Sequence, residues 1–150
     1  MVSKMREEKR ILSLRLLNLN KLMKKTDTAF QLRRRLESAD KQGVVRCISC
    51  GTFGFYNRGF DGGHYIQRQH KGTRYSSANV WPQCKHCNKW LSGNHAKYED
   101  GLIAKIGKDA VEDLKREKDL IPSIGFREFC ISILLESEKI NKQLKKLYEK

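Results

Sequence analysis

The sequence predicts an α+β fold in which a small region of strands and turns lies between helical segments. Residues 1–46 and 108–150 are largely helix formers, whereas glycines recur among aromatic and β-branched residues over 47–83, as is typical of short strands and turns. Two Cys-x-x-Cys pairs enclose this glycine-rich region. Because 150 residues is the length of one domain, we expect a single domain, 1–150, with a core at 47–107, a basic helical N-terminal extension and a helical C-terminal extension.

Two helices are expected in the N-terminal extension. Residues 5–24 contain too many Leu and Ile residues for one apolar stripe, which predicts a helix buried on more than one side. Thr26 or Asp27 is expected to cap a second helix that ends near Lys41. The basic run at 33–35 on this second helix is either a solvated face or a phosphate contact.

Further helices are expected after the second cysteine pair. One begins at Asn88, another at residues 95–106 with Asn94 as its cap, and a polar helix follows over 108–118. A long helix is expected after Gly125, with a nearly heptad seam that either pairs two subunits or covers its own domain. The seam consists of Phe126, Cys130, Ile133, Ser137, Ile140, Leu144 and Leu147.

The net charge of +14 is concentrated in the first two thirds of the chain. Residues 1–46 carry 13 Lys and Arg against 5 Asp and Glu, and residues 47–107 carry 8 against 3, whereas 108–150 is nearly balanced at 10 against 9. Such an excess of positive charge favours a polyanion, so nucleic acid is the expected partner class. The sequence has no run of 18 apolar residues, which argues against a helical membrane span.

The N-terminus is charged where a signal peptide would be apolar, so a cytoplasmic location is expected. In a reducing compartment, Cys-x-x-Cys pairs are typical of metal sites rather than disulfides. Each pair places two thiolates on one turn, and four thiolates can close tetrahedrally on a zinc ion. We therefore expect a closed, structural zinc site that performs no chemistry. Its ligands are Cys47, Cys50, Cys84 and Cys87, while Cys130 is expected to be a buried thiol.

Four residues between and after the cysteines indicate a second, open site. A neutral imidazole suits a general base near pH 7, so His64 is the candidate base, and the side-chain carbonyl of Asn79 could orient its ring. Asp61 and Asn88 offer the oxygen ligands that suit a hard cation such as Mg²⁺.

The runs CISCG, DGGHY, QCKHCN, SGN and YEDGLIAKIG resemble the lambda Rap/NinG recombination endonuclease family of zinc-clamped HNH, or ββα-metal, nucleases. A more distant likeness is to phage endonuclease VII, a Holliday-junction resolvase. The resemblance covers roughly residues 26–107. It implies that His64 is the general base, that Asn79 orients it, and that Asn88 binds the metal in place of a final His. Many HNH enzymes have Asp or His immediately before the base, where this chain has Gly63, and Asp61 is the nearest carboxylate.

The resemblance implies a zinc-stabilised ββα-metal core flanked by N-terminal helices and a long C-terminal helix. It also implies a Mg²⁺- or Mn²⁺-dependent endodeoxyribonuclease that cleaves branched DNA, such as Holliday junctions or D-loops, in phage-type recombination, as a homodimer in the host cytoplasm. The alternatives are a non-catalytic zinc-containing module that binds nucleic acid and an HNH endonuclease that acts on linear duplex DNA. The expected DNA contacts are Arg33, Arg34, Arg68, Lys71, Arg74 and Lys89.

Overall fold

The computed structural model describes residues 1–149 and confirms the mixed α+β composition. Across these residues no helix combines the length and apolar character needed to cross a membrane. The helices are α1 (Val2–Arg15), α2 (Leu19–Ser38), the π-helical turn η1 (His86–Trp90), α3 (His95–Ile106), α4 (Lys108–Glu117) and α5 (Phe126–Lys145). The strands are β1 (Val44–Arg46), β2 (Phe53–Phe55), β3 (Phe60–His64) and β4 (Val80–Cys84).

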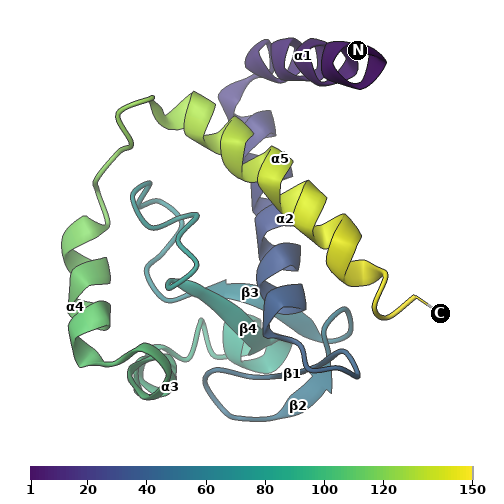
Figure 1. The fold of residues 1–150 in the computed structure, drawn as a ribbon. Helices are drawn as coiled ribbons and strands as arrows, with labels where there is room; N and C mark the ends of the chain where they lie inside the picture. The colour runs from purple at the N-terminus through teal and green to yellow at the C-terminus, as the bar shows by residue number, and fades with distance from the viewer. Residues whose placement is uncertain (150) are drawn as a thin grey trace.

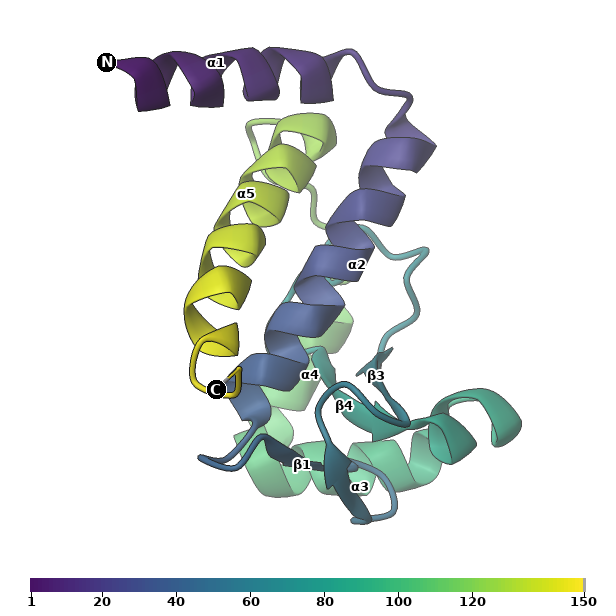
Figure 2. The same cartoon turned by 90° about the vertical axis from the view of Figure 1, so that its right-hand side faces the viewer.

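Helix α2 is the central element of the fold. It packs along α5 and also contacts β3 and β4, so it joins the helical part to the strands (Figures 1 and 2). Leu22 and Phe30 of α2 are buried against Cys130 and Leu134 of α5. Cys130 is fully buried, which confirms the expectation of a buried thiol.

The seam of α5 covers its own domain. Phe126, Cys130 and Ser137 are buried, whereas Leu147 at the end of the seam is 60% exposed. Because α2 already occupies this face, the seam does not offer an open strip for pairing two subunits.

The predicted helix boundaries near the N-terminus are wrong. The chain breaks at Asn18, whose side-chain oxygen accepts a hydrogen bond from the Asn20 amide (2.8 Å), so Asn18 is the cap of α2. Thr26 and Asp27 lie inside α2, and the Thr26 hydroxyl donates back to the Leu22 carbonyl (2.9 Å) instead of capping.

Helix α1 lies across one end of the α2–α5 pair (Figure 2), and most of its surface is exposed. Leu14 is its only fully buried side chain within the described residues, so the prediction of burial on several sides is also wrong for α1. The reason is that α1 touches little besides α5, partly through the Arg10–Glu138 and Arg15–Glu128 ion pairs.

The strands form two antiparallel ribbons. β1 pairs with β2, and β3 pairs with β4 in a register that places Asp61 opposite Gln83 and His64 opposite Val80. Glycine is required at Gly63, because a Cβ there would collide with the Gln83 side chain. This close approach of β3 and β4 explains why the position preceding His64 carries no carboxylate.

The segment after the second cysteine pair differs in part from the prediction. Helix α3 has the predicted bounds, and α4 and α5 also lie where helices were expected. The helix expected to begin at Asn88 is instead a single π-helical turn, η1. Asn94 precedes α3 but makes no side-chain cap hydrogen bond.

Candidate functional site

The four cysteines of the two pairs form a cluster at the junction of β1, β4 and η1. Their Sγ atoms all lie within 4.8 Å of one another, and the Cys50 and Cys84 Sγ atoms are 3.8 Å apart. Tetrahedral thiolates at about 2.3 Å from a zinc ion are separated by roughly 3.8 Å. The cluster could therefore hold a zinc ion, as the spacing predicted, and such an ion would tie both strands to the helical turn.

Hydrogen bonds to sulfur favour the thiolate of Cys47, whereas burial raises the pKa of Cys84 and of Cys87. The Cys84 amide donates to the Cys47 Sγ (3.4 Å), and the Asn94 side-chain amide donates to the Cys87 Sγ (3.4 Å). Burial opposes ionisation of Cys47, but backbone hydrogen bonds outweigh it and lower the pKa of this thiol to about 7. Asn94, expected only as a helix cap, thus supports the metal site.

Three of the four residues predicted for the second site line one cavity of about 620 Å³. Asp61 and His64 reach it from β3, and Asn88 reaches it from η1. Sequence reasoning did not identify the glutamines of this cavity, because glutamine is common on exposed surfaces and no motif marks it. The other lining residues are Gln31, Gly62, Gln67, Arg68, Gln69, Lys89, Ser92 and Gly93.

Asp61 and Asn88 are in direct contact in the cavity. The Asn88 Nδ2 donates a hydrogen bond to the Asp61 Oδ2 at 3.0 Å. This contact links the β3 strand to η1, and it leaves the Asn88 amide oxygen and the second Asp61 oxygen for other ligands.

The His64 ring is oriented by a backbone carbonyl rather than by Asn79. Its Nε2 lies 2.9 Å from the Arg74 carbonyl oxygen. Because a carbonyl can only accept, Nε2 carries the proton of the neutral ring and Nδ1 retains its lone pair. Burial lowers the pKa of His64 to about 4, so the ring is neutral near pH 7.

Asn79 instead fixes the loop between β3 and β4. Its side-chain oxygen accepts from the Ile66 amide (2.7 Å), and its Nδ2 donates to the carbonyls of Ile66 (3.0 Å) and Thr73 (3.1 Å). The expected contact with His64 is therefore corrected, because these bonds join Asn79 to the start of the loop at Ile66 and to its interior at Thr73. Arg68, which lines the cavity, belongs to this loop.

Asp27 fixes the segment whose carbonyl orients His64. Its carboxylate accepts two hydrogen bonds from the Arg74 guanidinium (2.9 and 2.6 Å) and one from the Tyr75 hydroxyl (2.8 Å). Asp27 is buried within α2, so a central helix holds the support of the candidate base. The sequence offered only a capping role for Asp27, because nothing in the chain order indicates its pairing with Arg74.

The six basic residues expected to contact DNA fall into three groups of two. Arg34 is buried and donates to the Val80 carbonyl (2.9 Å), and Arg74 is engaged with Asp27, so for these two the expectation of DNA contact is corrected. These hydrogen bonds and the ion pair to Asp27 offset the cost of burying the two guanidinium groups. Arg68 and Lys89 are exposed and line the cavity.

The remaining two expected DNA contacts lie away from this cavity lining. Arg33 pairs with Glu37 (2.9 Å) and Glu136 (3.3 Å). Lys71 is half-buried, with its ammonium 5.0 Å from the centre of the Phe126 ring.

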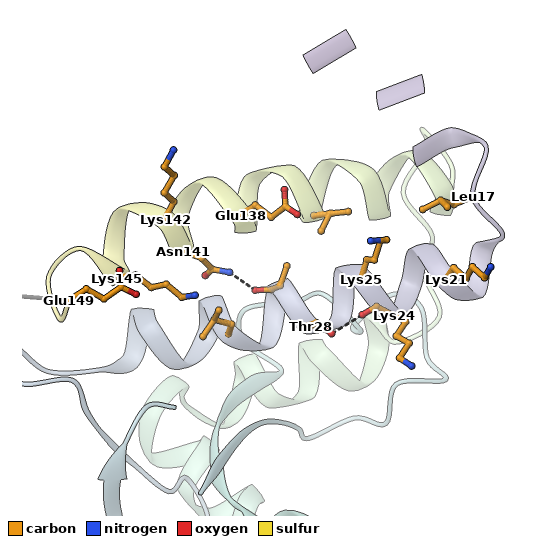
Figure 3. A pocket seen from close by; sticks show the side chains of 13 residues that line it. Leu17, Lys21, Lys24, Lys25, Thr28, Glu138, Asn141, Lys142, Lys145 and Glu149 are labelled. Carbon is orange, nitrogen blue, oxygen red and sulfur yellow. Dashed lines mark hydrogen bonds between the residues drawn. The ribbon is translucent and has the colours of Figure 1, made fainter. Parts of the chain in front are cut away.

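A second cavity, of about 860 Å³, lies between α2 and α5 (Figure 3). Asn141 crosses it by donating from Nδ2 to the Ala29 carbonyl at 2.9 Å. Apolar side chains mix with lysines along this groove, and within residues 1–149 none of the predicted site residues line it. Its lysines are Lys21, Lys24, Lys25, Lys142 and Lys145.

Comparison with known proteins gives the family of the chain. "Protein ninG" of Escherichia phage lambda is 37% identical over 70 residues, which are 46% of this chain and 33% of that protein. "Protein ninG" of Salmonella phage P22 is 36% identical over 72 residues, 47% of this chain and 34% of that protein. The chain therefore covers about a third of the curated relatives that it matches.

No solved structure matches the chain. A family model described as "Bacteriophage Lambda NinG protein" matches residues 2–148. Since this match takes in nearly the whole sequence, the chain belongs to the bacteriophage lambda NinG family.

Proposed function

We propose that this NinG-family protein is a metal-dependent, HNH-type endodeoxyribonuclease that cleaves branched DNA during phage recombination. The observation that supports the proposal is the meeting of an imidazole, a carboxylate and an amide in one cavity, contributed by His64, Asp61 and Asn88. The order of the elements supports it as well, because β3 and β4 form an antiparallel pair that leads directly into η1. Preference for branched DNA rests on the likeness to junction-cleaving nucleases.

Asp61 and Asn88 are the residues that would hold a catalytic Mg²⁺ or Mn²⁺ ion. Their donor atoms fit such an ion, because carboxylate and amide oxygens are hard ligands. A bound divalent ion would stabilise charge on the scissile phosphate and the leaving oxygen. The hydrogen bond between Asn88 and Asp61 keeps the two side chains close together.

His64 would act as the general base of the reaction. Its Nδ1 accepts a proton from a water molecule, whose oxygen then attacks the phosphorus atom. The bond from phosphorus to O3′ breaks, and O3′ takes a proton from solvent, which leaves a 3′-hydroxyl and a 5′-phosphate end. The Arg74 carbonyl keeps the ring oriented and stabilises the imidazolium that forms, because it accepts a hydrogen bond from Nε2–H both before and after the proton transfer.

The DNA backbone would pass along the basic side of the cavity. Arg68 and Lys89 provide cationic side chains at the lining itself. Because phosphate contacts release counterions, binding is expected to weaken steeply as the salt concentration rises. A response to salt that is flat would argue against this surface as the DNA contact.

A homodimer would supply the two coordinated cuts that junction resolution requires. Because α5 packs on its own α2, the N-terminal helix α1 is the better candidate for the dimer contact. Its Met5, Leu12 and Leu16 side chains are 51%, 57% and 88% exposed.

The test of this proposal is cleavage of a four-way junction and of a linear duplex with the same sequence, in Mg²⁺, by the wild type and His64→Ala. The expected result is cutting of the junction by the wild type only, with junction binding preserved in His64→Ala. Equal cutting of both substrates would favour the linear-duplex alternative. Cutting that is equal in the wild type and the variant, or absent from both while binding persists, would favour the non-catalytic module.

A further inference from the structure

The π-helical turn η1 presents an aromatic side chain to solvent beside the candidate site. Trp90 is 82% exposed, and Leu91, which follows it, is 47% exposed. The other tryptophan, Trp81, is half-buried, with the Arg34 guanidinium 4.8 Å from its ring centre. Burying a tryptophan ring would stabilise the fold considerably, so a tryptophan this exposed suggests a role other than packing.

The turn that carries Trp90 is firmly held. Cys87 within it is fully buried in the cysteine cluster. The Gly93 amide donates to the Cys87 carbonyl (2.9 Å), and the Gln83 side chain donates to the Gly93 carbonyl (2.7 Å). These hydrogen bonds hold the backbone before and after Trp90, so the position of the Trp90 backbone is fixed.

Trp90 is flanked in sequence by residues that line the candidate cavity. Asn88 and Lys89 precede it, and Ser92 and Gly93 come shortly after. Lys89, the residue before Trp90, is exposed and adds positive charge to the same turn. An exposed aromatic plane beside a cation is the combination that binds single-stranded nucleic acid, because a base stacks on the ring while its phosphate meets the charge.

We infer that Trp90 is a stacking site for an unpaired nucleobase of the DNA substrate. The ligand class is an unstacked base, such as one on the displaced strand of a D-loop or at an opened branch point. The inference rests on the proposed function for its position beside a cleavage site. It adds a physical basis for preferring DNA with unpaired bases at a branch over fully paired duplex, since a fully paired duplex offers no free base to the ring.

Binding of two matched probes tests the inference. One is a DNA duplex with a central bulge of three thymines, and the other is the same duplex fully paired. Trp90→Ala is expected to weaken binding of the bulged duplex by about 5- to 150-fold, the range for losing one stacked base. Binding of the paired duplex should stay unchanged, and Trp90→Phe should retain most of the preference for the bulge.

Phe53→Ala is the matched control. Phe53 is also an exposed aromatic, 68% accessible, with the Arg46 guanidinium 5.5 Å from its ring centre, but unlike Trp90 it has no sequence neighbours that line the cavity. Its removal should leave the bulge preference intact. A loss of the same size in Phe53→Ala and Trp90→Ala, or an equal loss on both probes, would overturn the inference.

Fluorescence gives a second measurement that does not depend on cleavage. The chain has two tryptophans, so the difference in quenching between the wild type and Trp90→Phe reports on Trp90 without altering Trp81. In buffer without Mg²⁺ and on a His64→Ala background, the bulged duplex should quench the Trp90 signal and the paired duplex should not. Absence of this quenching overturns the stacking site even if the nuclease is confirmed, whereas quenching without any nuclease activity would reject only the proposed catalysis.

Discussion

At the scale of single residues, the candidate base depends on partners that no motif reveals. Its ring is held by the Arg74 carbonyl, and Arg74 is held by the buried carboxylate of Asp27. The sequence did indicate His64, Asp61 and Asn88, because imidazole, carboxylate and amide groups lay close to cysteine pairs of metal-binding spacing. It could not indicate the role of Arg74, since every residue has a backbone carbonyl and the residue type does not show which one accepts a hydrogen bond from His64.

Substituting Asp27 tests this chain of contacts. Asp27→Asn leaves the Arg74 guanidinium without its anionic partner, and breaking a buried ion pair costs about 3–5 kcal/mol. We expect a loss of this order in the free energy of unfolding, measured by urea denaturation. Glu136→Gln is the control, since the Glu136 side chain is 55% exposed and an ion pair to an exposed carboxylate contributes at most about 1 kcal/mol. Similar losses in both variants would contradict the role of Asp27.

The burial of His64 makes stability depend on pH in a defined window. The pKa of His64 falls from 6.5 to about 4 on folding, so between these values the unfolded chain binds more protons than the folded one. Stability from this group is therefore fully present above about pH 6.5 and is lost as the pH falls towards 4.

His64→Gln removes this titration while retaining a polar side chain. Urea denaturation at pH 7 and pH 5 should show a smaller loss of stability on acidification in His64→Gln than in the wild type. Comparing the two proteins isolates His64 from the thiols, which titrate in both. An identical loss would show that the ring is not protected from protonation in the folded protein.

At the scale of elements, the helices after residue 94 were predicted well, whereas the break between α1 and α2 was not. The bounds of α3 follow from a Gly at its end, whereas the break between α1 and α2 lies in a stretch where leucines continue across Asn18. Because these leucines continue the apolar pattern of a single helix, the sequence did not indicate Asn18 as the cap of α2. The sequence predicted short strands but not their pairing into two ribbons, because pairing between short strands depends on contacts distant in sequence.

Asn18 should be more important to α2 than its neighbour Asn20. Asn18→Ala removes the side-chain acceptor of the Asn20 amide and is expected to lower the free energy of unfolding by about 1 kcal/mol. Asn20→Ala keeps that backbone amide and should cost little. Equal effects in thermal denaturation of the two variants would show that the cap does not stabilise α2.

We expect a zinc ion to be bound by the four clustered cysteines and not by Cys130. Cys84→Ser removes one thiolate from the group and is expected to abolish stoichiometric zinc and to lower the melting temperature. Cys130→Ser leaves the group complete and should keep one zinc ion per chain, even if its packing suffers. Metal content by mass spectrometry checks both, and zinc retained in Cys84→Ser would contradict the assignment.

At the scale of the whole molecule, the proposed dimer can be tested through α1. Leu12→Lys with Leu16→Lys places charge on the exposed face of a helix that contributes little to the core. We expect this double variant to sediment as a monomer in analytical ultracentrifugation while the wild type sediments as a dimer. Ser13→Lys is the control on the same helix, and dimers in the double variant would exclude this face.

The central position of α2 also makes the two halves of the chain depend on each other. Gln31 of α2 meets Gly62 of β3, and Asp27 of α2 holds Arg74 from the loop that follows. A crossover between related genes at residues 39–43 would transfer every cysteine pair and His64 but would exchange the helix that supports them. Mosaic proteins with that breakpoint are expected to keep the four clustered cysteines but to lose the matched contacts of Gln31 and Asp27, so α2 and the hairpins should work only as a matched set.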